Sequence, residues 1–256
     1  MTVDPAVRTQ WASVAERYGR GWARAAGPDL DWLAEALEPR RSDRALDLGA
    51  GAGHAAIAVA PHVAEVVATD PTPEMLAVAG RLAAERGLAN IRFVEAAADA
   101  LPFPDCSFDL AFSRHSVHHW PDPAAGFREV ARVLRPGGRF VAIDTHGLED
   151  GQVDAFLVTL ELLRDPTHVR ALAPSAWRRL LGEAGFEAEV VRTWENRHET
   201  EPWLANTDPA PWRADAVRAL LRDAPAGIRE RLRIAPDGST FGVDAGLVLA
   251  RREATR

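Results

Sequence analysis

The stretch that decides the fold spans residues 44–70 and reads RALDLGAGAGHAAIAVAPHVAEVVATD. It opens with a short apolar run, residues 45–48, which has the length and composition of a buried strand. The glycine-rich segment over residues 49–53 comes next and predicts a tight turn, because glycine adopts positive φ angles without steric cost. A ligand can also approach such a turn closely, since no Cβ atoms stand in its way.

The second half of the stretch predicts a helix and a further strand. Residues 54–60 are Ala-rich and favour a helix, which Pro61 ends because its ring clashes with the preceding turn. Residues 63–69 form the next predicted strand and lead directly to Asp70. A strand, a glycine-rich turn, a helix and a strand ending in an acid are typical of folds that bind nucleosides at the carboxyl ends of parallel strands. Asp70 follows Asp47 by 70 − 47 = 23 positions, near the roughly 20-residue spacing of an acid that binds the ribose.

The glycine spacing then narrows the class of ligand. The dinucleotide pattern G-x-G-x-x-G would place its third glycine at position 54, where this chain has His54. The chain instead reads D-x-G-x-G-x-G from Asp47 to Gly53. In this pattern it resembles the class I S-adenosylmethionine-dependent methyltransferases, whose first motif is an acid followed by GxGxG. The resemblance implies S-adenosylmethionine as the cofactor, with Asp47 near its methionine end and Asp70 on the ribose hydroxyls.

The resemblance is continuous over residues 44–144 and implies further cofactor contacts. The segment EAAADALPF, residues 95–103, matches the third cofactor motif of the family, in which the acid at position 99 accepts a hydrogen bond from the adenine amino group. The complete set of cofactor-binding residues that we expect is Tyr18, Asp47, Gly49, Ala50, Gly51, Gly53, Asp70, Pro71, Met75, Ala98, Asp99, Ala100 and Ser113. Simpler alternatives remain, because Met75 can be a core residue and Asp99 can cap a turn.

The segment after the fourth predicted strand, residues 108–113, resembles one subgroup of this family. It reads RHSVHHWPDP over residues 114–123, and RPGGRF precedes the fifth predicted strand, residues 140–144. These motifs are similar to those of ubiquinone/menaquinone-biosynthesis-type and other small-molecule methyltransferases. The resemblance implies a small-molecule acceptor that is methylated on oxygen or carbon rather than on nitrogen.

Candidate catalytic and substrate-binding residues lie in the same segment and further along the chain. His115 follows the fourth strand, where the ligand lies in an open α/β sheet, and we predict it to be a general base. Arg114, His119, His168 and Arg170 are predicted to contact the acceptor. His118 and His119 match a His-His pair of the subgroup and are interpreted as mainly structural. A zinc site is the alternative for these histidines, but no complete ligand set accompanies them, so we expect no metal.

Composition limits the function further. The chain has 256 residues, a net charge of −7 and one cysteine, and its 30 basic residues are all arginine. A lysine Schiff base is therefore excluded, and the lack of a basic tract argues against a nucleic-acid substrate. No apolar run approaches the roughly 18 residues of a membrane span, so we expect a cytoplasmic protein without membrane contact. A homodimer is compatible with the sequence.

The whole pattern predicts an α/β fold, a Rossmann-like three-layer sandwich. We expect a mostly parallel seven-stranded sheet whose last strand is antiparallel. Residues 1–38 are predicted to be lid helices, residues 39–256 the methyltransferase domain, and residues 195–236 a helical insertion before the last strand. The motifs report cofactor binding and not the reaction, so a cyclase or decarboxylase on the same scaffold remains the main alternative. A nicotinamide-dependent oxidoreductase and a non-catalytic subunit are less favoured.

Overall fold

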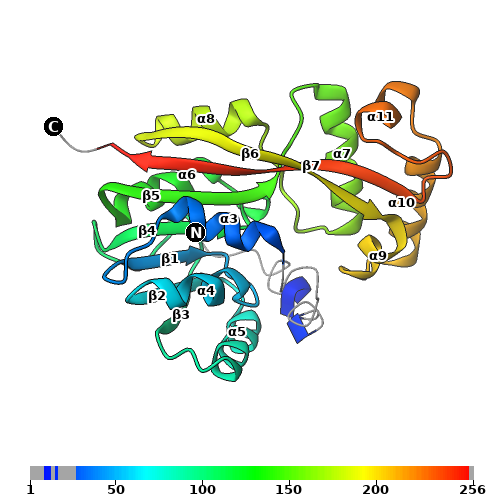
Figure 1. Ribbon diagram of the computed structural model, residues 1–256. Helices are drawn as coiled ribbons and strands as arrows, with labels where there is room; N and C mark the ends of the chain where they lie inside the picture. Colours follow the sequence, from blue (N-terminus) through cyan, green and yellow to red (C-terminus); the bar gives the residue numbers. More distant parts are fainter. Residues whose placement is uncertain (1–8, 13–14, 17–26, 254–256) are drawn as a thin grey trace.

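The computed structural model describes residues 9–12, 15–16 and 27–253. Its centre is a seven-stranded sheet with the strand order β3-β2-β1-β4-β5-β7-β6 (Figure 1). The strands are β1 (Arg44–Leu48), β2 (Glu65–Asp70), β3 (Ile91–Glu95), β4 (Phe108–Arg114), β5 (Leu134–Thr145), β6 (Phe186–Glu199) and β7 (Thr240–Arg252). Strand β7 runs antiparallel to both of its neighbours, and the other pairs in the sheet are parallel. The predicted sheet is thus confirmed.

The strand order reverses direction at β1, which pairs with β2 on one side and with β4 on the other. In such a sheet the crevice for a ligand opens at the carboxyl ends of the strands next to this reversal. The segments that leave these carboxyl ends are the predicted glycine turn, Asp70 and the histidine-rich segment. They therefore meet at one edge of the sheet.

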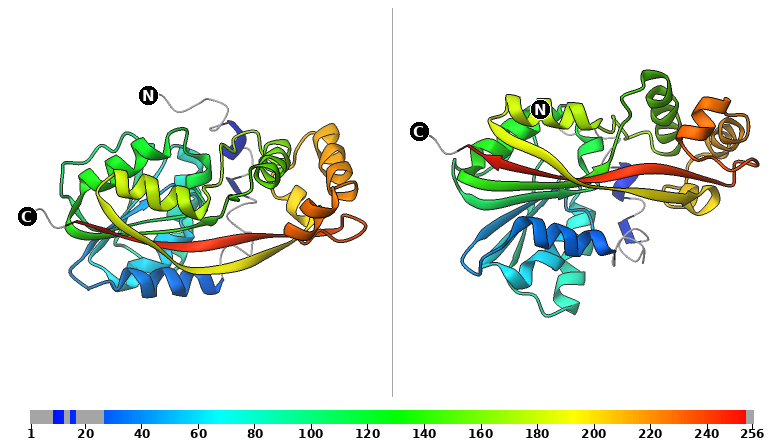
Figure 2. Two further views of the ribbon diagram at one scale, coloured as in Figure 1. Left: turned by 90° about the horizontal axis from the view of Figure 1, so that it is seen from above. Right: turned by 45° about the horizontal axis from the view of Figure 1, so that its top comes forward.

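Helices cover both faces of the sheet and complete the three layers (Figure 2). The helices α3 (Pro28–Leu37), α4 (His54–Val59) and α5 (Pro73–Glu85) pack on one face, and α6 (Pro123–Val133) and α8 (Pro174–Glu183) on the other. Leu33 and Leu37 of α3 are fully buried against the sheet. Helix α3 therefore belongs to a covering layer, which corrects the assignment of all residues up to 38 to a lid. A lid role for the segment before α3 stays a prediction.

The helical insertion has a hydrophobic core of its own. It comprises α9 (Thr200–Ala205), α10 (Pro211–Arg222) and α11 (Ala226–Arg231), which pack with α7 (Gly151–Arg164) and the far ends of β6 and β7. We predicted that the insertion begins at residue 195, but it begins at Thr200. The reason is that β6 continues to pair with β7 as far as Glu199, which lies opposite Thr240. The insertion thus lies beside the carboxyl ends of the parallel strands (Figure 1).

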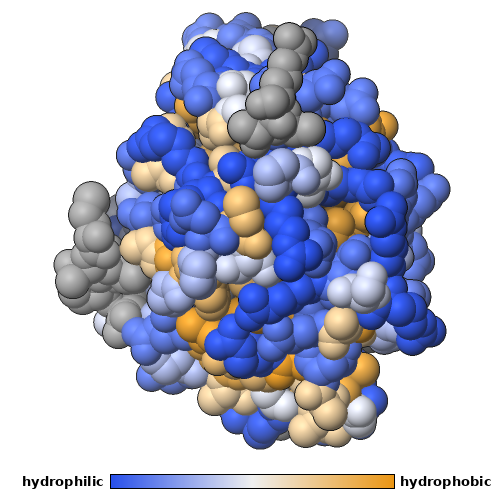
Figure 3. All heavy atoms as spheres, turned by 90° about the vertical axis from the view of Figure 1, so that its left-hand side faces the viewer, coloured by the Kyte–Doolittle hydropathy of each residue, from blue (hydrophilic) through white to orange (hydrophobic). Residues whose placement is uncertain are grey.

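The opposite edge of the sheet carries an ordinary solvated surface. On the face that Figure 3 shows, hydrophilic residues predominate and hydrophobic ones form small areas between them. Ion pairs at this edge join Arg44 to Glu65 at 2.6 Å and Arg139 to Glu38 at 2.7 Å. Among the described residues, no helix combines the length and the apolar character that a membrane crossing needs.

Candidate active site

The turn after β1 takes the shape that its three glycines predict. Gly49, Gly51 and Gly53 have φ angles of 65°, 53° and 80°, a region that L side chains rarely adopt. A Cβ atom on Gly49 would lie 1.8 Å from the Ser116 hydroxyl, and one on Gly53 would lie 2.8 Å from the Ala79 Cβ. The last glycine therefore lets α4 approach α5, and the first lets the turn approach the segment after β4.

Asp70 holds this glycine turn in place. Its carboxylate accepts hydrogen bonds from the backbone N–H of Gly51 at 2.8 Å and of Thr72 at 2.9 Å. Burial raises the pKa of Asp70 to about 6, although both of these N–H groups favour the ionised form. The predicted ribose acid thus also joins the end of β2 to the turn after β1.

Asp47 is a buried carboxylate without a well-formed hydrogen bond from any described residue. Only 1% of its surface is exposed, and neither carboxylate oxygen accepts a hydrogen bond of normal geometry from a described residue. Burial raises its pKa to about 8; the nearby Ala56 N–H offsets part of this effect, and the charge of Asp70 adds to it. A buried acid without a partner is costly unless a ligand satisfies it. A cationic group such as the amino group of S-adenosylmethionine would do so.

A small hollow of about 40 Å³ lies between this carboxylate and the segment after β4. Its walls include Asp47, Gly49 and Gly51, together with Arg114 and His115. The glycine turn leaves this space free of side chains, and the unpartnered acid lies on its wall. These residues fit the methionine end of the predicted cofactor.

The other predicted cofactor residues lie at the same edge of the sheet but are less closely grouped. Asp99 and its neighbours Ala98 and Ala100 lie in the turn after β3. At the start of this segment the Ala96 N–H donates a hydrogen bond of 3.3 Å to the Asp70 carbonyl. Met75 is buried and packs with Ala15 and Ala52, and Pro71 is half-buried next to Asp70. Ala50 lines the hollow. Tyr18 lies outside the described residues.

Ser113 of β4 is fully buried, and its hydroxyl forms no hydrogen bond with a described residue. It lies opposite Ala142 of β5, one residue before Arg114. No contact of the structure tests its predicted role toward the cofactor, which stays a prediction.

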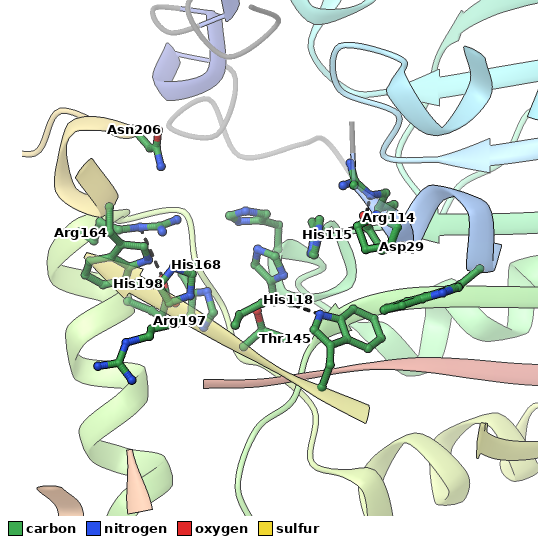
Figure 4. Close-up of a pocket in the computed structure, with 18 of the residues that line it drawn as sticks. Asp29, Arg114, His115, His118, Thr145, Arg164, His168, Arg197, His198 and Asn206 are labelled. Carbon is green, nitrogen blue, oxygen red and sulfur yellow. Dashed lines mark hydrogen bonds and ion pairs between the residues drawn. The ribbon is translucent and has the colours of Figure 1, made fainter. Parts of the chain in front are cut away.

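A second, larger cavity of about 530 Å³ adjoins the hollow, and Arg114 and His115 line both spaces (Figure 4). Its aromatic lining consists of Trp11, Trp32, Trp194 and Trp203, and its histidine lining of His115, His118, His119, His168 and His198. The cavity lies between the carboxyl edge of the sheet and the insertion. Its volume is in the range of small-molecule sites.

An ion pair joins the start of α3 to the end of β4 where the two spaces meet. The Arg114 Nε lies 2.6 Å from the Asp29 carboxylate, and the His115 Nε2 lies 3.8 Å from it. Burial alone would raise the pKa of Asp29, but His115 and Arg114 hold it well below its usual value. His115 has a φ angle of 53°, and its N–H donates to the Ile143 carbonyl at 2.7 Å. A non-glycine residue held in this conformation is characteristic of functional sites.

His118 forms a dyad with Asp144, a residue that the sequence analysis missed. The His118 Nδ1 lies 2.5 Å from Oδ1 of Asp144, and the His118 backbone N–H donates to Oδ2 at 3.2 Å. Burial alone would lower the pKa of His118, but the carboxylate outweighs this effect and raises the pKa. An acid at the end of β5, next to the end of β4, was the sequence signal that could have identified Asp144.

His119 and His168 lie against this dyad and stay neutral. Their ring centroids lie 4.3 Å and 5.3 Å from that of His118. Burial, together with the charge of His118, lowers the pKa of each to about 3. The structure thus brings both predicted residues into the cavity wall. It does not bring Arg170 there, because the guanidinium of Arg170 is paired with Asp154 at 2.6 Å.

No metal-binding group accompanies these histidines. Within the part of the chain that the structure describes, no three or more His, Cys, Asp or Glu side chains are placed to hold a metal ion.

This combination of sheet, glycine turn and buried acids defines a class I methyltransferase, and comparisons with known proteins agree. Residues 46–142 match the family model of the methyltransferase domain. The chain is 39% identical over 196 residues to the uncharacterized methyltransferase YcgJ of Bacillus subtilis, covering 77% of this chain and 78% of that protein. The crystal structure of YcgJ superposes with a TM-score of 0.86 at 33% identity, covering 88% of this chain and 98% of the other.

Two further relatives are similar over different lengths. The uncharacterized protein YafE of Escherichia coli is 35% identical over 202 residues, which cover 79% of this chain and 97% of YafE. A demethylmenaquinone methyltransferase of Thermus thermophilus is 41% identical over 123 residues, 46% of this chain and 56% of that protein. The chain belongs to the S-adenosylmethionine-dependent methyltransferases, and S-adenosylmethionine is its cofactor.

Proposed function

We propose that the protein methylates an oxygen or carbon nucleophile of a small-molecule acceptor bound in the 530 Å³ cavity. The observation that carries this proposal is the meeting of the cofactor hollow and the cavity at Arg114 and His115. An acceptor in the cavity would approach the methyl group from the side opposite Asp47. The relative named demethylmenaquinone methyltransferase also favours a small-molecule acceptor. A cytoplasmic location and a homodimer stay predictions.

The residues of the hollow would hold the cofactor as the family pattern implies. Asp47 would bind the amino group, Asp70 the ribose hydroxyls and Asp99 the adenine amino group. The bound cofactor supplies an electrophilic methyl group. The chain itself aligns the acceptor with that group in a site closed to water, and such alignment can contribute roughly 7–11 kcal/mol.

His115 is the general base of this proposal. It lines both the hollow and the cavity, whereas His118 lines only the cavity. Its backbone is fixed by the hydrogen bond to Ile143, and Asp29 lies 3.8 Å from its Nε2. From this position His115 would accept the proton of an acceptor hydroxyl or carbon acid.

Transfer of a labelled methyl group tests the proposal. The protein is incubated with S-adenosylmethionine carrying a radioactive methyl group and with a metabolite extract from which macromolecules have been removed. We expect the label in the small-molecule fraction, together with release of S-adenosylhomocysteine. Label in added protein or RNA would contradict the proposal. A cofactor that stays unconverted, with neither S-adenosylhomocysteine nor a labelled acceptor formed, would favour the cyclase or decarboxylase alternative.

The role of His115 is tested in the same assay. His115→Ala should lower transfer by roughly 10²–10⁴-fold, the usual contribution of general acid–base catalysis. Affinity for S-adenosylhomocysteine should change little, because the predicted ribose and adenine contacts lie elsewhere. His62→Ala is the matched control, since His62 is exposed in the short 3-10 turn, Ala60–His62, that follows α4. Full activity of His115→Ala would show that alignment alone drives the reaction.

A further inference from the structure

The ion pair of one buried arginine in the cavity wall is longer than a normal hydrogen bond. Arg164, the last residue of α7, is only 8% exposed and lines the cavity. Its guanidinium lies over the ring of Trp203, with 4.6 Å between the guanidinium carbon and the ring centroid. The buried Nε has no hydrogen bond to a described residue, and the carboxylate of Glu161 lies 3.5 Å away. A buried guanidinium is usually hydrogen-bonded to an anion, so this one is a candidate for ligand binding.

Other charged side chains lie close to Arg164 at this end of the cavity. Asp165, the next residue along the chain, accepts hydrogen bonds at Oδ1 from the N–H and hydroxyl of Thr167 at 2.9 Å and 2.7 Å, and its Oδ2 lies 4.0 Å from Nε2 of His119. At the same end of the cavity lies Arg197, whose nearest ion-pair partner is Glu195 at 4.0 Å (Figure 4). Two arginines therefore face one lining carboxylate, that of Glu161, at this end.

The other charges of the cavity are already paired. Arg114 and Asp29 form their ion pair where the cavity meets the hollow. His118 is paired with Asp144 between the two ends. Figure 4 shows Arg164, Arg197 and His168 at one end and Arg114, Asp29 and His115 at the other. Arg164 and Arg197, whose ion-pair partners lie 3.5 Å and 4.0 Å away, are thus at the end away from the cofactor hollow.

We infer that the acceptor is an anionic small molecule whose carboxylate or phosphate binds Arg164 against Trp203, while its nucleophilic atom faces His115 at the other end of the cavity. This inference rests on the proposed function and specifies its class of substrate. The planar guanidinium can form two parallel hydrogen bonds to an oxyanion. The aromatic residues between the two ends would contact the body of the acceptor.

Four small probes of similar shape and different charge test the inference. Binding of benzoate, phenyl phosphate, benzamide and benzamidine to the full-length protein with S-adenosylhomocysteine is measured by calorimetry. We expect an anionic probe to bind about 10- to 100-fold more tightly than neutral benzamide, the range for a hydrogen bond to a charged group. Comparison of benzoate with phenyl phosphate then separates a carboxylate from a phosphate. Equal affinity for benzamide, or preference for benzamidine through Glu161, would overturn the inference.

Substitution of the arginine assigns the preference to this site. Arg164→Gln should abolish the preference for the anionic probe, and Arg164→Lys should reduce it because lysine lacks the planar fork. Arg222→Gln is the matched control, since Arg222 is exposed on α10 and does not line the cavity. Unchanged affinity for S-adenosylhomocysteine verifies that each variant is folded. If Arg164→Gln cannot be obtained folded, magnetisation transfer between bound benzoate and the Trp203 indole is measured in the wild type. We expect this transfer, and its absence would overturn the inference.

The two proposals fail in different ways. A wild type that binds anionic and neutral probes equally, yet labels a neutral metabolite, would contradict the anion site and leave the proposed function intact. A wild type that prefers the anionic probe, yet labels protein or RNA, would contradict the proposed function and leave the anion site intact.

Discussion

The Nδ1 atom of His118 lies 2.5 Å from Oδ1 of Asp144, so a buried acid at the end of β5 fixes the imidazole that follows β4. The histidine charge in turn lowers the pKa of Asp144 to about 2, against the effect of burial. Each group of the dyad therefore stabilises the charged form of the other. We expect Asp144→Asn to lower the pKa of His118, because burial then acts without the carboxylate.

Nuclear magnetic resonance titration of the histidine ring protons measures this change. A His118 pKa that is the same with and without Asp144 would show that the dyad is not an ion pair. The interaction that raises the pKa of His118 stabilises the folded protein fully below about pH 6.5. This stabilisation is lost as the pH rises through the pKa of His118 in the folded state.

His168 should make the protein sensitive to acid. Its pKa is lowered to about 3, so between pH 6.5 and 3 the unfolded chain binds a proton that the folded chain does not. The free energy of unfolding should then fall by about 1.4 kcal/mol for each pH unit in this window. Between pH 7 and pH 5 the free energy of unfolding of His168→Gln should therefore fall by about 2 kcal/mol less than that of the wild type. Urea unfolding at the two pH values measures this difference. Parallel losses in both proteins would show that His168 is protonated in the folded state.

Cofactor binding should release a proton from Asp47. Its pKa is raised to about 8, so the carboxyl is mostly protonated at pH 7 and must ionise to pair with an amino group. Affinity for S-adenosylhomocysteine should rise between about pH 6 and pH 8. Calorimetry at pH 7 in phosphate and in Tris measures the released proton as a difference in binding enthalpy, and Asp47→Asn should remove that difference. Equal enthalpies in the wild type would place the amino group elsewhere.

The described part of the N-terminal segment should contribute to turnover through Trp11. Its indole Nε1 donates to the Thr167 hydroxyl at 3.2 Å, and its ring packs edge-on against His119 at 5.3 Å. Trp11→Ala should open this side of the cavity to water and reduce methyl transfer, while S-adenosylhomocysteine affinity stays unchanged. Trp212→Ala is the control, because Trp212 is 62% exposed on α10. Equal loss of activity in both variants would contradict a covering role for Trp11.

The parts of the fold that the sequence predicted well depend on residues that are close together along the chain. The apolar runs of β1 and β2, the three glycines between them and Pro61 act within a few positions of one another, so the order of these elements could be inferred directly. Helix α7, Gly151–Arg164, depends on local pattern in the same way, because its apolar residues recur at helical spacing. The end of β6 could not be inferred, since its last residues are held by pairing with β7 rather than by apolar character.

The candidate site was predicted less completely because its groups meet across long distances in the sequence. His118 and Asp144 are 26 positions apart, and Arg114 and Asp29 are 85 apart. Arg164 is one of many arginines, and only the fold shows that it lies over Trp203 in a cavity. Conversely, Arg170 looked suitable for an acceptor, but α7 presents Asp154 to it, and the two side chains pair.

A crystal structure with bound S-adenosylhomocysteine tests the central claim most directly. We predict the amino group on the Asp47 carboxylate, the ribose hydroxyls on Asp70, and the sulfur at the junction lined by Arg114 and His115, facing the cavity. The sulfur marks the position from which the methyl group leaves. A sulfur that faces away from the cavity, or an amino group that does not contact Asp47, would contradict the proposed path of methyl transfer.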